Sequence, residues 1–588
     1  MTNRQIAEKL RHMAVFYEMD GVPFRPQAYE KAADAIDALG PDEPLDRLFA
    51  AKGRDGLRTV PGVGEGIAHH IEEMIRRGTF REYERMAAKY PVNLDELSGI
   101  EGVGPKTIKT LYQKLRIKDL AGLERAAAAG KIRGLPRFGA KTEANLIRSI
   151  ELRRRSAGRR LLGDILPLAR RIETELRGVR GVRHAVVAGS IRRRQETIGD
   201  IDILATAAGP ERVMEKFIRL PEVAEVLEHG PTKTAVRLDN GVQADLRVIP
   251  EASYGAALQY FTGSKEHNVI VRKLAIARGL KLNEYGLWKS RKSVAARSEE
   301  DVYRAVGLDY IEPELRTASG EIEAAAAGGL PDLIPYGSVR GDLQVQTDWT
   351  DGSHSIADMA EAARRRGLEY LAVTDHTKAL AMVGGLDEKK LARQGREIDA
   401  LNRRLEKDGV NFRVLKGSEV DILRDGSLDL ADAALKKLDM VGAAVHSHFH
   451  LSRSEQTARI IRAMKNPHVD IIFHPTGRVI NKREPCDFDM EAVIKAAKAT
   501  GTALEIDAAP DRLDLKDSHV RLAVRAGVKL VIDSDAHRPE HFDWLELGVA
   551  VARRGWAATK DVLNTGSYRD LKKWLSKAKN KREKGPRK

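Results

Sequence analysis

The sequence predicts a multidomain protein with a helical N-terminal region, a central α/β domain and a C-terminal βα domain shaped as a distorted barrel. Length is the first observation, because 588 residues exceed the roughly 100–200 residues of one compact domain. The second is a glycine-rich repeat among helix-patterned segments near the N-terminus. The third is a series of apolar strands that alternate with helical stretches beyond residue 335, a pattern typical of βα units around a parallel sheet.

The composition indicates a soluble, intracellular protein with an anionic partner. A net charge of +15 creates a field that attracts polyanions such as nucleic acid. Cys486 is the only cysteine, so an internal disulfide is excluded and any metal must be held by His, Asp or Glu. The N-terminus lacks the apolar stretch of a signal peptide, and no uncharged run approaches the ~18 residues of a membrane span. We therefore expect a cytoplasmic protein without a membrane partner.

The glycine-rich repeat occurs in three copies, each of which predicts a helix, a tight turn and a second helix. The copies are Val60–Gly64, Ile100–Thr107 and Leu135–Thr142. Glycine lets the backbone approach a ligand closely, while the free N–H groups that open the second helix suit a phosphate. A glycine that merely ends a helix would explain one copy, but two copies share a Gly-Val-Gly core. The repeats resemble helix-hairpin-helix motifs, and the DNA-binding residues that this implies are Gly62, Gly64, Gly102, Gly104 and Lys106.

Two carboxylates project side by side from a strand of the central α/β domain. The segment Ala185–Leu204 predicts a strand, a Gly189-Ser190 turn, a basic loop and a second strand with Asp200 and Asp202. Strand side chains alternate between faces, so these aspartates point the same way. Asp245 lies inside another apolar alternating strand, where an unpaired charge is costly. Three such acids suit two Mg²⁺ ions that also bind phosphate oxygens. The alternative is a surface Asp-x-Asp at a strand end.

Together with Tyr260-Phe-Thr-Gly-Ser264, these residues resemble the palm and thumb of a family X DNA polymerase over about residues 1–315. The resemblance implies that the primer 3′-hydroxyl attacks the α-phosphate of the incoming nucleotide and releases pyrophosphate. Asp245 would assist deprotonation of that hydroxyl. The Gly189-Ser190 turn and Arg193 supply backbone donors and positive charge for a triphosphate.

Further contacts implied by the resemblance lie in the thumb. Tyr260 and Phe261 would pack on the nucleotide sugar, and Gly263 would allow its close approach. Asn268 would touch the incoming base, and Arg272 would reach the template strand. Alternatively, the two aromatic residues are ordinary core side chains.

The N-terminal region lacks the lysine that one activity of the family requires. Family members that excise a 5′-deoxyribose phosphate use a lysine on the second helix of the first hairpin, because only an amine forms a Schiff base. This position carries His70, and the nearby Lys31 is the available substitute. We therefore expect the region to grip a 5′-phosphate and the gap rather than to act as a lyase.

Metal-type ligands end almost every strand of the C-terminal βα domain, where barrels place their chemistry. A single histidine at a strand end is usually structural, but five separate strand ends carry such residues. The segments resemble a polymerase-and-histidinol-phosphatase (PHP) domain, which often acts as a manganese-dependent 3′→5′ exonuclease. The ligands that this implies for Mn²⁺ or Zn²⁺ are Asp351, His376, Glu419, His446, His474, Asp535 and His537.

The opening motif of this domain departs from the PHP pattern. Gln344 and Gln346 stand where the family has two histidines, and neutral amides are much poorer metal ligands. The resemblance then implies one weakened metal position and leaves a nuclease and a mainly structural domain as alternatives. His354 either compensates as a ligand or faces solvent as a loop residue.

The predicted organisation places a final helix end near Trp574 and Leu575, before a disordered basic tail. The segments are a helix-hairpin-helix DNA-binding domain at 1–88, a fingers-type helix-hairpin-helix domain at 89–155, a palm at 156–250, a thumb at 251–316, a linker at 317–335, a PHP domain at 336–575 and the tail at 576–588. We expect a monomeric, template-directed polymerase that fills gaps in DNA repair, binds gapped or nicked DNA and dNTPs, and works at the bacterial nucleoid. The alternatives are a DNA-binding or end-bridging scaffold with vestigial catalysis and a template-independent nucleotidyltransferase.

Overall fold

The computed structural model describes the chain except for residues 40–43, 101, 137, 156–157, 291 and 584–588. The chain divides into two compact units, one made of Met1–Ala157 with Asn481–Arg483 and the other of Gly158–Ile480 with Glu484–Lys588. All the described strands belong to the second unit. No described helix combines the length and the apolar character that a membrane crossing needs.

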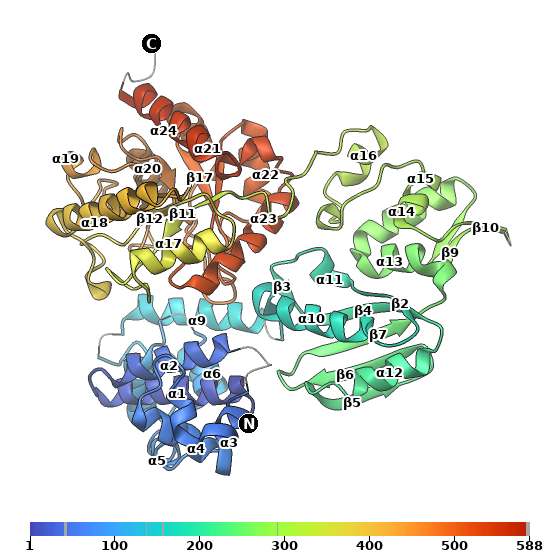
Figure 1. Cartoon of the computed structure of the whole chain (residues 1–588), viewed down its shortest axis with the longest axis horizontal. Coiled ribbons are helices and arrows are strands. Elements are labelled where there is room, and N and C mark those ends of the chain that lie inside the picture. Colours follow the sequence, from blue (N-terminus) through green and yellow to red (C-terminus); the bar gives the residue numbers. More distant parts are fainter. Residues whose placement is uncertain (40–43, 101, 137, 156–157, 291, 584–588) are drawn as a thin grey trace. The chain divides into compact units, whose positions relative to one another are not determined.

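The first unit consists of helices packed around one apolar core, drawn in blue and cyan in Figure 1. Each predicted glycine turn lies directly before a helix and closes with the same backbone bond, for example from Val63 N to Val60 O at 3.1 Å. Glu101 and Arg137, in the second and third copies, lie outside the described residues. The helices are α1 (Asn3–Asp20), α2 (Arg25–Ala38), α3 (Leu45–Leu57), α4 (Glu65–Arg77), α5 (Arg81–Lys89), α6 (Leu94–Leu97), α7 (Pro105–Leu115), α8 (Leu120–Ala128) and α9 (Ala140–Arg155).

The predicted palm is a five-stranded mixed sheet in the order β2-β4-β7-β6-β5. β4 and β7 are parallel, and the other neighbouring pairs are antiparallel. The predicted Gly189-Ser190 turn is a single helical turn, α11, that packs on β4. The elements are β1 (Arg160–Leu161), α10 (Leu162–Arg177), β2 (Val182–Val187), α11 (Gly189–Arg192), β3 (Thr197–Ile198), β4 (Asp200–Ala207), α12 (Pro210–Ile218), β5 (Val223–His229), β6 (Lys233–Leu238) and β7 (Gln243–Val248).

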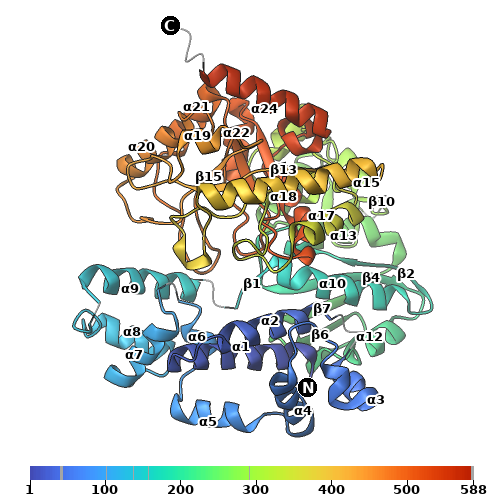
Figure 2. The same ribbon diagram turned by 60° about the vertical axis from the view of Figure 1, so that its left-hand side comes forward.

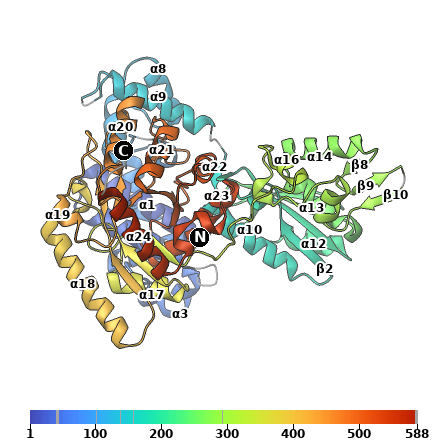
Figure 3. The same cartoon turned by 90° about the horizontal axis from the view of Figure 1, so that it is seen from above.

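The thumb combines helices with a small antiparallel sheet, which Figure 3 shows beside α13 and α14. Its elements are α13 (Tyr254–Thr262), α14 (Lys265–Ala277), β8 (Lys281–Asn283), β9 (Gly286–Lys289), β10 (Lys292–Ala295) and α15 (Glu299–Ala305). The segment predicted as a linker contains α16 (Glu321–Ala326), which is anchored rather than free. The buried carboxylate of Glu321 lies 2.8 Å from His267 Nδ1 and also accepts from two backbone N–H groups.

The predicted PHP domain is a parallel βα fold whose strands form two sheets, β11-β12-β13 and β14-β15-β16-β17-β18. Isolated bridges from Val345 to Ala536 and from His376 to Glu419 join the sheets, which matches the predicted distorted barrel. Figure 2 shows α18 alongside β13. The elements are β11 (Gly341–Val345), α17 (Ile356–Arg365), β12 (Tyr370–Val373), α18 (Glu388–Lys407), β13 (Arg413–Lys416), β14 (Glu419–Asp421), α19 (Asp432–Leu435), β15 (Gly442–Ala444), α20 (Arg453–Met464), β16 (Ile471–Ile472), α21 (Met490–Thr500), β17 (Ala503–Asp507), α22 (Asp517–Ala526), β18 (Leu530–Asp533), α23 (Leu545–Arg554) and α24 (Tyr568–Glu583).

The C-terminal helix α24 is longer than predicted. The predicted helix end near Trp574 was wrong, because helical backbone continues to Glu583. Leu571 and Leu575 pack in the same apolar cluster as Phe473, and a helix anchored in this way extends at little cost beyond its packed turns. The last part of the predicted tail, residues 584–588, lies outside the described residues.

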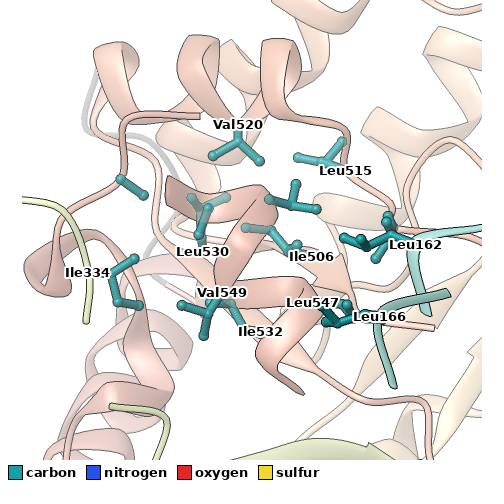
Figure 4. Packing of buried hydrophobic residues seen from close by; sticks show 14 of the residues in the cluster. Leu162, Leu166, Ile334, Ile506, Leu515, Val520, Leu530, Ile532, Leu547 and Val549 are labelled. Atoms are coloured by element: carbon teal, nitrogen blue, oxygen red, sulfur yellow. The ribbon is translucent and has the colours of Figure 1, made fainter. Parts of the chain in front are cut away.

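Palm and PHP domain share one apolar core within the second unit. Leu162 and Leu166 on α10 pack in the same cluster as Leu547 of α23 (Figure 4). A Cβ added to Gly163 would lie 2.6 Å from Pro510 Cβ, so only glycine permits this close approach. The contact joins the first palm helix directly to the PHP core.

Candidate active sites

The three palm aspartates converge at one edge of the sheet. The parallel register places Asp202 opposite Asp245, and carboxylate oxygens of these two and of Asp200 lie within 4.8 Å of one another. Their neighbours Ile201 and Leu246 are buried, so strand alternation turns the aspartates to the other face. Three carboxylates at this separation repel one another unless cations lie between them. The oxygen-only donor set suits Mg²⁺.

Gly189 lies against this cluster because it has no side chain. Its φ is +57°, and an added Cβ would lie 2.2 Å from Asp202 Oδ2. The N–H of Ala188 donates to the carbonyl of Asp202 at 2.8 Å, which holds α11 beside β4. The predicted triphosphate-binding residues Ser190 and Arg193 are thereby placed next to the aspartates.

The charge balance of the cluster is incomplete without cations. Burial, and then repulsion from Asp200 and Asp245, raises the pKa of Asp202 to about 6. Burial lowers the pKa of Arg193, while Asp202 acts in the opposite direction. Arg193 donates to the carbonyl of Thr262, but its buried Nε has no hydrogen-bond partner among the described residues. A further anion, such as a triphosphate, can satisfy this donor.

The predicted nucleotide-contacting residues of the thumb cluster around the end of α13. The rings of Tyr260 and Phe261 pack edge to face at 5.1 Å, and both residues remain partly exposed, unlike core aromatics. Asn268 Nδ2 donates to the carbonyl of Tyr260 at 2.7 Å. A Cβ added to Gly263 would lie 2.9 Å from Arg193 Nη1. Arg272 is exposed on α14.

The predicted DNA-binding glycines of the first unit are exposed. Gly62 and Gly102 have φ of 78° and 81°, which only glycine adopts without strain. Gly64 and Gly104 directly precede α4 and α7, and Lys106 is exposed in the first turn of α7. These positions leave the backbone open to a phosphate.

His70, at the position of the lyase lysine, is integrated into the helical core. Its Nδ1 lies 2.7 Å from the hydroxyl of Tyr29, and its ring stacks on Phe80 at 4.5 Å. Burial lowers the pKa of His70, so its neutral form is favoured. Lys31 is exposed, and its carbonyl carbon would lie 3.4 Å from a Cβ added to Gly62.

In the PHP domain, imidazoles and carboxylates from separate strand ends meet around Glu419. Glu419 Oε1 lies 2.7 Å from His474 Nε2 and 3.0 Å from His446 Nε2. Asp351 Oδ2 lies 3.5 Å from His376 Nε2. Two overlapping groups have atoms close enough to share an ion: Asp351, His376 and His537, and His376, Glu419 and His446.

Of the seven predicted PHP ligands, His474 and Asp535 belong to neither group. Asp535 is buried, and its Oδ1 accepts no hydrogen bond from a described residue. Burial opposes protonation of His446, but Glu419 and Asp421 outweigh it and raise the pKa of His446 to about 10. His354 is exposed and belongs to neither group, which fits the solvent-facing alternative.

Gln346, one of the two glutamines of the opening motif, contacts the PHP centre directly. Gln346 Nε2 donates to Glu419 Oε2 at 2.8 Å, so an amide satisfies an oxygen that faces the centre. Gln344 is fully buried, and neither amide atom bonds to a described residue. The histidines of the centre suit a divalent ion, whereas an amide such as that of Gln346 is a weaker metal ligand.

Comparison with known proteins shows the family of the chain. Family models match residues 1–80 (helix-hairpin-helix domain), 94–152 (SAM-like helix-hairpin-helix tandem) and 257–317 (DNA polymerase beta thumb). The DNA polymerase/3′-5′ exonuclease PolX of Bacillus subtilis (strain 168) is 37% identical over 582 residues, which cover 98% of this chain and 100% of that protein. The chain belongs to the PolX family of DNA polymerases.

Two further relatives each match part of this PolX-family chain. DNA polymerase lambda of Rattus norvegicus is 26% identical over 53% of this chain and 56% of its own length. A probable phosphatase of Thermoanaerobacter sp. (strain X514) is 30% identical over 41% of this chain and 96% of its own length. The matches confirm the predicted family and the predicted fold class.

Two residues that support the PolX-family sites were not predicted from sequence. Gln243 Nε2 lies 3.2 Å from both carboxylate oxygens of Asp245, and Asp421 Oδ1 lies 2.9 Å from His446 Nδ1. Each precedes or follows a predicted ligand by two positions in a strand, so the two-residue period that aligned Asp200 with Asp202 would have found both.

Proposed function

We propose that the chain is a template-directed DNA polymerase that fills short gaps during DNA repair. The observation that carries the proposal is the convergence of Asp200, Asp202 and Asp245 within 4.8 Å. Beside them lie a glycine turn and Arg193, whose buried Nε has no hydrogen-bond partner among the described residues. Membership of the PolX family supports the same activity. The exposed glycine turns of the first unit and the net charge of +15 suit contacts with the DNA backbone.

Each palm residue has a separate part in this proposal. The aspartates hold two divalent ions, proposed to be Mg²⁺, which when bound stabilise the attacking and leaving oxygens of the in-line displacement. Asp245 assists removal of the proton from the primer 3′-hydroxyl, whose oxygen bonds to the α-phosphorus as the bond to pyrophosphate breaks. Ser190, Arg193 and the backbone of Gly189 hold the triphosphate.

The other proposed contacts orient the substrates. Tyr260 and Phe261 pack on the nucleotide sugar, and Gly263 leaves room for it. Asn268 reads the base edge, for which it must exchange its bond to Tyr260. Arg272 reaches the template strand, and the first unit binds DNA phosphates through Gly62, Gly64, Gly102, Gly104 and Lys106.

Loss of Asp245 tests the polymerase proposal. We expect Asp245→Ala to abolish incorporation on a one-nucleotide gap and to leave affinity for gapped DNA within about threefold, because metal ligation and phosphate gripping use different residues. Asp239→Ala removes an exposed acid from the turn between β6 and β7 and should extend like the parent. Single-turnover extension and fluorescence anisotropy give the two readouts, and retained extension by D245A would refute the proposal.

The same substrates separate the alternatives. Extension that requires a template base excludes a template-independent nucleotidyltransferase, whereas gapped-DNA binding without any extension identifies a scaffold. We further propose that the protein acts as a monomer on gapped or nicked DNA and dNTPs in the bacterial cytoplasm, at the nucleoid. Light scattering of the protein with and without gapped DNA tests the monomer.

For the PHP domain, we propose a divalent-metal centre with weak 3′→5′ exonuclease activity. The two ligand groups around His376 support it, and Mn²⁺ and Zn²⁺ both accept imidazole and carboxylate donors. Asp351, Glu419, His446, His474, Asp535 and His537 complete the proposed ligand set.

Restoring the missing histidines tests the PHP proposal. We expect Gln344→His with Gln346→His to bind one more Mn²⁺ ion in calorimetry and to degrade 3′ ends at least tenfold faster, because imidazoles replace poor amide ligands. Asp245→Ala in the same background removes polymerase activity and should not change the degradation. Unchanged stoichiometry and rate would show that the amides are not the limiting defect.

A further inference from the structure

The loop that follows α11 is held by the PHP domain rather than by the palm alone. This loop, residues 193–196, starts at Arg193, the proposed triphosphate ligand, and ends at Glu196. Arg478 of the PHP domain contacts Glu196 with both terminal nitrogens, Nη1 at 3.1 Å and Nη2 at 2.6 Å. Arg554 Nη2 lies 3.2 Å from the same carboxylate. One palm carboxylate is thus shared by two PHP guanidinium groups.

A second contact reaches the backbone next to Arg193. Arg554 Nη1 donates to the carbonyl of Arg194. Arg194 itself has a φ of 53°, a left-handed conformation that non-glycine residues adopt only where the surroundings hold it. Its side chain is also bound by the PHP domain, 2.9 Å from Glu546 on α23. The strained residue is therefore clamped at both its carbonyl and its guanidinium.

We call the contacts of Arg478 and Arg554 with Glu196 and Arg194 the clasp. Both PHP arginines of the clasp are themselves held by hydrogen bonds within the PHP domain. Arg478 Nε donates to the carbonyl of Arg512 at 2.8 Å, and Arg554 Nε donates to Asp517 at 2.9 Å. The side chains of Arg478 and Arg554 are only 11% and 1% exposed. Charge-assisted, bidentate bonds such as the one from Arg478 to Glu196 are strong and directional. The loop is therefore bound by side chains that the PHP domain holds in place.

We propose that Arg478 and Arg554 are positioning residues for nucleotide binding, which makes the PHP domain a structural part of the polymerase site. They act through Glu196 and the carbonyl of Arg194 to fix the backbone that carries Arg193 and Ser190. This inference rests on the proposed polymerase function. It is independent of any nuclease activity, because neither arginine belongs to the PHP metal-ligand groups.

Nucleotide affinity is the property that tests the clasp. We expect Arg478→Met and Arg554→Met each to raise the apparent Kd for the correct dNTP about tenfold in single-turnover gap filling, with the maximal rate changed less than threefold. Glu196→Gln keeps the shape of the loop and should have a similar effect. Arg366→Met breaks an ion pair to Asp543 that lies within the PHP domain and should leave the Kd unchanged.

Every outcome of this experiment decides the inference. The substitutions E196Q and R478M remove the same interaction, so the Kd of the double variant for dNTP should not exceed the larger of the two single-variant values. Additive losses of affinity would argue against the proposal. A lower reaction amplitude with unchanged Kd would show a merely structural role and overturn the proposal. If R554M does not fold, the isosteric E196Q decides alone. No extension by the parent protein would instead refute the polymerase function.

Discussion

A methyl group at position 189 should disable the polymerase site without unfolding the palm. In Gly189→Ala the new Cβ would lie 2.2 Å from Asp202 Oδ2 and 3.1 Å from Asp202 Cγ. Ordinary contact begins at 3.4 Å, so the carboxylate or the α11 backbone must move by about 1 Å, a displacement that can cost about 100-fold in rate. The left-handed φ of +57° adds about 1–2 kcal/mol of strain for alanine.

Two measurements separate these effects. Urea denaturation should show that G189A lowers the free energy of unfolding by about 1–2 kcal/mol, while single-turnover gap filling slows about 100-fold. Gly209→Ala is the matched control, because its Cβ would meet only Arg212 Cδ at 4.0 Å and its φ is negative. If folded G189A fills gaps within threefold of the parent, the close approach of Gly189 to Asp202 does not position the metal ligands.

Two further changes probe charges buried in the palm and thumb. Because the pKa of Asp202 rises from 3.8 to about 6 on folding, its ionisation destabilises the metal-free fold fully above about pH 6 and not at all below about pH 4. Asp202→Asn should therefore stabilise the protein in EDTA by up to about 3 kcal/mol at pH 8. Urea titrations should show this gain in the free energy of unfolding shrinking as the pH falls through 6. A gain that does not change with pH would contradict the raised pKa of Asp202. Glu299→Gln leaves Arg192 and the fully buried Arg316 without their shared carboxylate and should cost about 3–5 kcal/mol in the free energy of unfolding. Asp301→Asn, at a half-exposed side chain of the same helix, should change it little.

The sequence alone determined the chemistry available to each domain. Strand alternation was enough to place Asp200 and Asp202 on one face, because the two-residue period is local and does not depend on partners. The glycine turns were equally readable, since a positive φ at Gly62 and Gly102 is a property of the backbone there. The same local signals identified the strand ends that carry the PHP ligands, and the family resemblance identified the two glutamines that stand where the family has histidines.

Only the tertiary structure decided which of these groups meet. Asp245 reaches Asp202 through the parallel register of β4 and β7, which pairs residues far apart in the chain. The link from Arg478 to Glu196 spans 282 positions, so no local pattern could indicate it. The extension of α24 and the anchoring of α16 likewise depend on packing against distant residues. Residue periodicity fixes the direction of a side chain, whereas its neighbours are set by long-range packing.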